Sequence, residues 1–171
     1  MAEKAAQLAG PSSASLAMIA RFLAQPSAPP EDWAARAERS FPSPAERPMK
    51  NVALAYALLA DQHYQAAVQA LKPLYDATSP TADDSLPILL GWAYLESGKP
   101  KEAAELLRFN PIPSATVLKP FLVFDFPRLF YLRGRVAEMA GSRDQAAAQF
   151  RIFRQLSGDT PLAWGEEARA K

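Results

Sequence analysis

The sequence predicts an all-α fold in which about three pairs of helices stack into a right-handed α-solenoid. The main observation is a pattern that occurs three times: a small residue late in one helix, a short turn, an alanine, and then a bulky apolar residue. In every copy twelve residues separate the small residue from the alanine, at positions 55 and 67, 91 and 103, and 134 and 146. The bulky residues are Leu71, Leu107 and Phe150. Self-similarity of this kind is the sequence signature of repeat architectures.

Proline usage supports the same division into helices. The sixteen prolines outnumber the seven glycines, and thirteen of them lie in four clusters, at residues 26–30, 42–48, 73–87 and 111–127. Proline lacks a backbone N–H and clashes inside a helix, so these clusters are expected at the joints between helices. The 49% of apolar residues in a chain of 171 residues suffices for a packed core.

Residues 1–48 are expected to form a flexible lead and two helices. The first helix covers residues 12–24, with apolar side chains on one face, and the second covers Pro30–Ser40. The acidic Glu31 and Asp32 suit the N-terminus of the second helix. This region holds no clear copy of the repeat, so it is interpreted as a cap or a degenerate repeat.

Residues 49–171 are expected to hold the helix pairs and a capping helix. The first pair covers Met49–Ala60 and Tyr64–Tyr75. The second begins near Asp84 or Ser85, ends its first helix before Gly98, and starts its partner helix at Pro100.

The third pair is expected to begin after Asp125, with Pro127 near its first turn. Its first helix stops at Gly141, and the capping box Ser142–Gln145 opens its second helix. A last helix starts at Thr160–Pro161 and closes the array.

The copies are unevenly spaced, because the third is preceded by an insert. Positions 67 and 103 are 36 residues apart, whereas positions 103 and 146 are 43 apart. The extra length falls in Asn110–Phe126, which contains the apolar run Phe121–Phe124. Two interpretations stay open: a lip that contacts a partner, or a strand-like segment packed over the helix ends. Packing is favoured, because apolar runs are usually buried.

The second copy resembles a tetratricopeptide repeat, a unit of about 34 residues, in Leu90, Gly91, Tyr94, Gly98, Ala103 and Leu107. The other two copies are similar, although Ala55 replaces a glycine, and Arg133 and Ala137 stand where the family prefers leucine and tyrosine. The small residues are expected to let paired helices approach closely, and the bulky residues to fill the space to the next pair. The resemblance covers residues 49–156.

The resemblance implies that the first helix of each pair lines a concave groove that holds a peptide or partner protein. The implied groove residues are Val52, Tyr56, Ile88, Trp92, Leu95, Arg128, Tyr131 and Arg135. Tyr56, Trp92 and Arg135 occupy equivalent places, and such residue types dominate binding hot spots. Structural packing of the aromatic residues and ordinary solvation of the arginines remain equally open.

The expected groove differs from one that grips a terminal carboxylate. Family members of that kind use lysine and asparagine, where this chain has Val52, Tyr56 and Ile88. A mostly apolar groove with arginines at one end suits a peptide with an acidic part.

No catalytic residue, metal site or cofactor is expected. His63, the only histidine, falls in a predicted turn, Asp83 and Asp84 read as helix caps, and Glu102 and Glu105 as a solvated face. The absence of cysteine excludes thiolate chemistry and disulfides. A formal charge of +1 with scattered basic residues argues against nucleic acid, and no run approaches the roughly 20 apolar residues that span a bilayer.

The expected function is therefore a non-catalytic protein–protein interaction module within a larger bacterial protein or assembly. The bacterial origin is inferred from the rich use of alanine and arginine, which is typical of GC-rich genomes. No signal peptide is recognised, and both cytoplasm and periplasm remain open. Two alternatives stay open: an α-solenoid that binds a small ligand or catalyses a reaction in a pocket beside the N-terminal helices, and self-association through the final helix or Phe121–Phe124.

Overall fold

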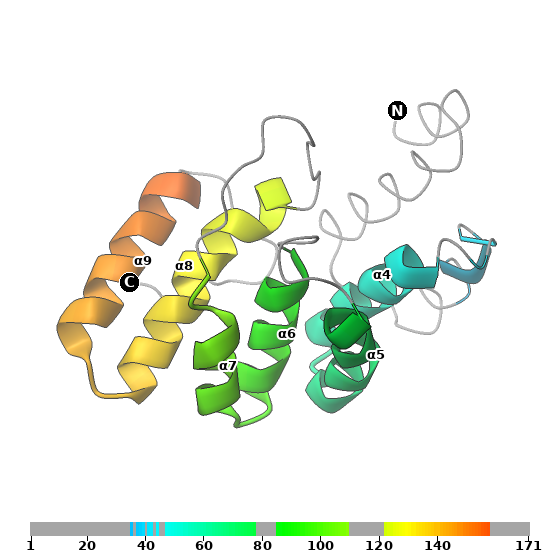
Figure 1. Cartoon of the computed structure of the whole chain (residues 1–171). Helices are drawn as coiled ribbons and strands as arrows, with labels where there is room; N and C mark the ends of the chain where they lie inside the picture. The colour runs from blue at the N-terminus through cyan, green and yellow to red at the C-terminus, as the bar shows by residue number, and fades with distance from the viewer. Residues whose placement is uncertain are drawn as a thin grey trace. The chain divides into compact units, whose positions relative to one another are not determined.

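The computed structural model describes residues 35, 37–39, 41–42, 44, 47–77, 85–109 and 122–157 (Figure 1). Every regular element in these ranges is a helix, and they contain no strand, which confirms the all-α prediction. The helices predicted at residues 12–24 and from residue 160 lie outside the described residues. The chain divides into two compact units, Met1–Leu74 and Tyr75–Lys171. This division falls within the repeat-like region, whereas the sequence resemblance places a boundary between residues 48 and 49.

The first unit contains helix α4, Arg47–Ala60, and most of helix α5, Tyr64–Ala77. Part of the predicted helix before them is also present, since Ala35 and residues 37–39 are helical. An ion pair of 2.7 Å between Lys50 Nζ and Glu38 Oε1 ties this stretch to α4. The unit buries an apolar set from these segments: Ala37, Phe41, Val52, Ala53, Ala55, Tyr56, Ala57, Leu59, Ala67, Val68 and Leu71.

Pro73 lies inside α5, and the helix continues to Ala77 instead of ending in a proline joint. Its ring removes the hydrogen bond that the Gln69 carbonyl would otherwise accept. Both residues are exposed, so water is expected to hydrogen-bond to that carbonyl in place of the lost N–H.

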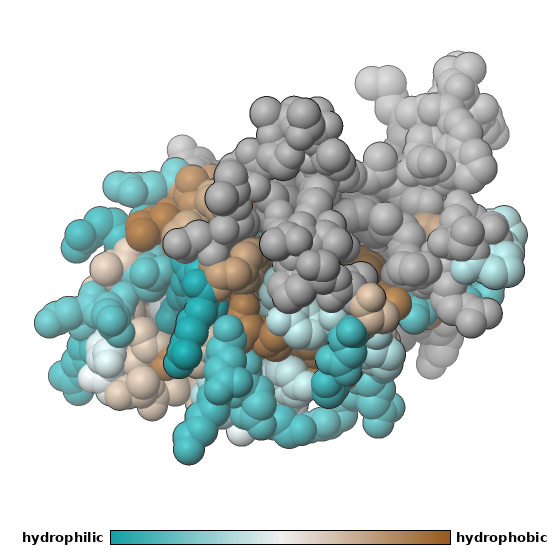
Figure 2. Space-filling model, in the orientation of Figure 1, coloured by the Kyte–Doolittle hydropathy of each residue, from teal (hydrophilic) through white to brown (hydrophobic). Residues whose placement is uncertain are grey.

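The second unit contains helices α6, Ser85–Glu96, α7, Pro100–Leu106, α8, Leu122–Met139, and α9, Arg143–Ser157. Helix α6 packs against α7 and α8, and α8 packs against α9 (Figure 1). Ten of the twelve residues of α6 are buried, so this helix is apolar around its whole circumference, as a core helix is. On the face seen in Figure 2, hydrophilic side chains cover α7 and α9.

The turns that join the helices of each pair share one backbone structure. Their left-handed residues are Gln62, Gly98 and Gly141, with φ angles of 62°, 78° and 74°. In each turn, the N–H of that residue donates to a carbonyl three residues back, and the next N–H donates to a carbonyl five residues back, over 2.8 to 3.2 Å. This is the Schellman motif, which satisfies the last carbonyls of a helix. The repeat in the sequence is therefore also a repeat of backbone structure.

Gly91 and Gly134 allow two helices to approach closely, as the sequence predicts. A Cβ atom at Gly91 would lie 2.8 Å from Leu107 Cδ2, and one at Gly134 would lie 2.6 Å from Phe150 Cδ1. Both distances are too short for a real side chain. Leu107 and Phe150 thus fill the space left by the glycine of their own pair. That these residues and Leu71 also fill the space to the next pair stays a prediction.

Helix α8 begins earlier than the sequence predicts, at Leu122 instead of after Asp125. Residues 122–126 are therefore helical, and the strand-like interpretation of this part of the insert is wrong. One reason is that Asp125 and Arg128 form a pair at i, i+3, a spacing that brings side chains together on a helix. Residues 110–121 lie outside the described residues.

Replacing Gln62 with glycine is expected to stabilise the protein by about 0.5–1 kcal/mol. A left-handed conformation costs a residue with a side chain about 1–2 kcal/mol, and the extra flexibility of glycine in the unfolded chain offsets about 0.5–1 kcal/mol of the gain. The midpoint of urea denaturation measures the change. As a control, Gly98→Ala should destabilise, since a Cβ there meets no atom within 4 Å and only the backbone conformation opposes it. An unchanged or lower midpoint for Gln62→Gly would contradict this account of the turn.

Replacing Gly134 with alanine is expected to destabilise the second unit by up to about 2 kcal/mol. Overpacking against the Phe150 ring costs about 1–3 kcal/mol, and the better helix propensity of alanine offsets about 1 kcal/mol of that. Thermal unfolding followed by circular dichroism checks this. The double variant Gly134→Ala/Phe150→Leu should lose less stability than the sum of the single changes, because the smaller side chain makes room. If the stability losses of the two single variants simply add up in the double variant, the side chains at positions 134 and 150 do not compete for the same space.

Candidate functional site

The contact between α6 and α8 brings several sequence-predicted site residues together. On α8, Arg128, Tyr131, Arg135 and Glu138 follow one another at intervals of three or four residues, so they share one side of the helix. Trp92 and Glu96 lie four residues apart on α6 and contact this side of α8. The cluster combines aromatic, basic and acidic side chains from two helices.

Arg128 belongs to a buried group of charges. Its guanidinium carbon lies 4.7 Å from the centre of the Trp92 ring, and its Nη1 lies 3.4 Å from Asp125 Oδ1. The side chains of Arg128 and Asp125 are 2% and 0% exposed. The flat guanidinium is attracted to the face of the indole, and the carboxylate neutralises its charge. Arg128 is therefore a packed and paired residue, and the interpretation as a solvated charge is wrong.

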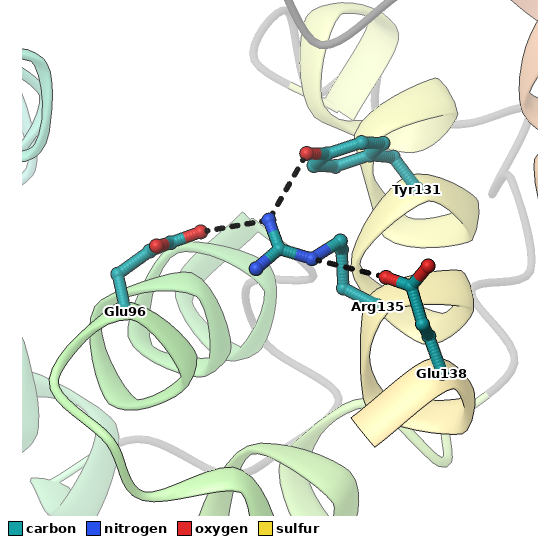
Figure 3. Close-up of polar contacts among 4 residues, drawn as sticks. All are labelled: Glu96, Tyr131, Arg135 and Glu138. Carbon is teal, nitrogen blue, oxygen red and sulfur yellow. Dashed lines mark hydrogen bonds and ion pairs between the residues drawn. The ribbon is translucent and has the colours of Figure 1, made fainter. Parts of the chain in front are cut away.

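Arg135 joins the two helices through a polar cluster near the surface (Figure 3). Its Nη1 donates to Glu96 Oε1 at 3.4 Å and to the Tyr131 hydroxyl at 3.2 Å. Its Nε lies 3.7 Å from Glu138 Oε2. Burial acts to lower the pKa of Arg135, but the Tyr131 hydrogen bond and the two carboxylates together raise the pKa above its ordinary value. Arg135 thus stays charged, and its charge is matched within the cluster.

Arg133 performs a role that sequence reasoning missed. Its Nε donates to the Leu107 carbonyl at 2.7 Å, and its Nη2 donates to the Phe109 carbonyl. These carbonyls follow the end of α7, where a positive charge is favoured by the helix dipole. Burial lowers the pKa of Arg133. The sequence did offer a signal for this role, because the tetratricopeptide pattern has a leucine at this position. The hydrogen bonds of Arg133 connect α8 to the end of α7.

The predicted groove residues fall into two classes of exposure. Arg135 is partly exposed, whereas the other seven side chains are buried, namely Val52, Tyr56, Ile88, Trp92, Leu95, Arg128 and Tyr131. Tyr131 packs its ring against Phe150 and Phe153 at 5.9 and 5.4 Å between centres. A partner role for these eight residues stays a prediction. The prediction that one end of the groove is basic is wrong, because carboxylates neutralise the charges of Arg128 and Arg135.

The remaining candidates for chemistry that the structure describes lie at the surface. His63 Nδ1 lies 2.6 Å from Asp61 Oδ2 in the turn between α4 and α5, and both side chains are exposed. Glu102 and Glu105 are exposed on α7, while Asp83 and Asp84 lie outside the described residues. In the described part of the chain, no group of three or more metal-binding side chains comes together. Among the helices with described residues, none has the length and apolar character needed to cross a bilayer.

Comparisons with known proteins give no further assignment. No family model, curated protein or solved structure matches the chain.

Removing Arg128 is expected to destabilise the protein strongly. Arg128→Met keeps the bulk next to Trp92 but leaves the buried Asp125 carboxylate without this partner, which costs about 3–5 kcal/mol. The double variant Arg128→Met/Asp125→Asn should recover part of the loss, because the uncompensated charge is gone. Urea denaturation of the four members of this cycle measures the coupling. Additive losses would show that the two charges do not depend on each other.

Proposed function

We propose that the chain is a non-catalytic protein-interaction module that binds a peptide or partner protein along the first helices of its repeats. In this proposal the helix pairs stack as a tetratricopeptide-like solenoid within a larger bacterial protein or assembly. The residues of each first helix that face away from the second helix then form the binding surface.

One observation carries the proposal, namely the contact between α6 and α8. These are the first helices of two successive pairs, and both end in the same type of turn. Their contact leaves Arg135, Glu96 and Glu138 at a partly exposed polar cluster beside buried aromatic side chains. Arginine and tyrosine held in fixed positions are the residue types found at binding hot spots. A surface fixed by ion pairs also loses little side-chain entropy when a partner binds.

Because Trp92 and Tyr56 are buried, their substitution is a poor test of partner binding. Their truncation would damage packing, so a loss of binding would have no clear meaning. Arg135 is partly exposed and its replacement by glutamine keeps a polar group at the surface. Arg151 on the exposed side of α9 offers a matched control for the same substitution.

We expect Arg135→Gln to weaken binding by about tenfold, or about 1.4 kcal/mol, because the guanidinium would contact the partner directly. Peptides are selected by phage display against the full chain, and calorimetric titration then gives their affinities for both variants. Arg151→Gln should bind within about twofold of the wild type, since surface changes away from a contact have little effect. Circular dichroism verifies that both variants keep their helices.

Recovery of no binding peptide would overturn the proposal of an interaction module. Equal affinities for Arg135→Gln, Arg151→Gln and the wild type would instead mean that the partner binds elsewhere on the chain.

A further inference from the structure

The polar cluster around Arg135 has an excess of negative charge. Among the residues that the structure describes, it contains two carboxylates, Glu96 and Glu138, and one guanidinium, while the nearby Asp125 and Arg128 carry one charge of each sign. The outermost group is also acidic, since the Glu138 side chain is 61% exposed, against 23% for Arg135. An approaching molecule therefore meets a carboxylate first.

The electrostatic state of Arg135 agrees with this arrangement. Its pKa is raised in spite of burial, because the surrounding carboxylates and the Tyr131 hydroxyl favour its charged form. An additional anion at this point would be attracted by one cation but repelled by two carboxylates. A cation would be attracted by Glu138 and Glu96.

Arg135 still has hydrogen-bonding capacity toward a neutral group. Its Nη1 and Nε serve the contacts with Tyr131, Glu96 and Glu138, and no contact of Nη2 is seen with any described residue. A guanidinium offers five N–H donors in one plane, so two of them remain on Nη2. A backbone carbonyl of a bound peptide fits these donors without adding negative charge.

We propose that this surface selects peptides with basic side chains, with a lysine or arginine placed against Glu138 and a backbone carbonyl that accepts from Nη2 of Arg135. The inference rests on the proposed function and adds the charge of the partner. It reverses the sequence-based expectation of an acidic peptide, because that expectation counted the arginines without their carboxylate partners.

The test uses three peptides of equal length and identical apolar positions, with lysine, glutamine or glutamate at the remaining positions. Fluorescence anisotropy measures their binding to the wild type, to Glu138→Gln and to the matched control Glu105→Gln on exposed α7. The lysine peptide should bind about fivefold more tightly than the glutamate peptide at low salt, and the ratio should fall as salt rises. Glu138→Gln should reduce this ratio, whereas Glu105→Gln should leave it unchanged.

Tighter binding of the glutamate peptide, or equal reductions of the ratio in the two variants, would overturn this inference and leave the interaction module standing. If none of the three peptides binds although phage display yields a binder, the charge preference alone is overturned. If the selection also yields no binder, the proposed function fails with it.

Discussion

The close approach of paired helices at a glycine is the constraint on which the second unit depends. The Phe150 ring occupies the space where a side chain at position 134 would lie, and the Leu107 methyl groups do the same at position 91. This contact sets the distance and rotation of α8 relative to α9 and of α6 relative to α7. The rotation of α8 in turn places Arg128 against Trp92 and Arg135 against Glu96 of α6. The geometry of the polar cluster thus depends on the packing of α8 against α9.

The shared turn explains why the glycine and the bulky residue meet. Gly91 lies seven residues before Gly98, and Leu107 lies nine residues after it; Gly134 and Phe150 have the same distances from Gly141. Seven residues are about two turns of helix, so the glycine keeps a fixed angle to the turn. The Schellman motif then reverses the chain with the same hydrogen bonds in each pair, so the second helix starts at the same position and in the same direction relative to the first. Sequence spacing is converted into contact because the turn is the same in each pair.

Local signals made much of this predictable, and long-range contacts set the limit. Glycine spacing, the turn positions and the helices around them depend on residues that are neighbours in the chain, so their pattern is readable. The start of α8 was missed because Pro127 is a strong local signal, whereas the pairing of Asp125 with Arg128 emerges only once the helix forms. The charge of the site was misread for a similar reason. Glu96 lies 39 residues from Arg135, and no periodic pattern in the sequence predicts that the two side chains interact.

The all-round apolar character of α6 has a consequence for the order in which the chain is made. A helix with ten of twelve residues buried needs neighbours on several sides, and within the second unit these include α7 and α8. Translation releases α6 and α7 well before α8, because residues 107–121 separate them. During that interval the nascent chain exposes apolar surface that later belongs to the core, which is the condition under which chains aggregate or bind chaperones. We therefore expect the incomplete chain to be most prone to aggregation while the segment that precedes α8 is being synthesised.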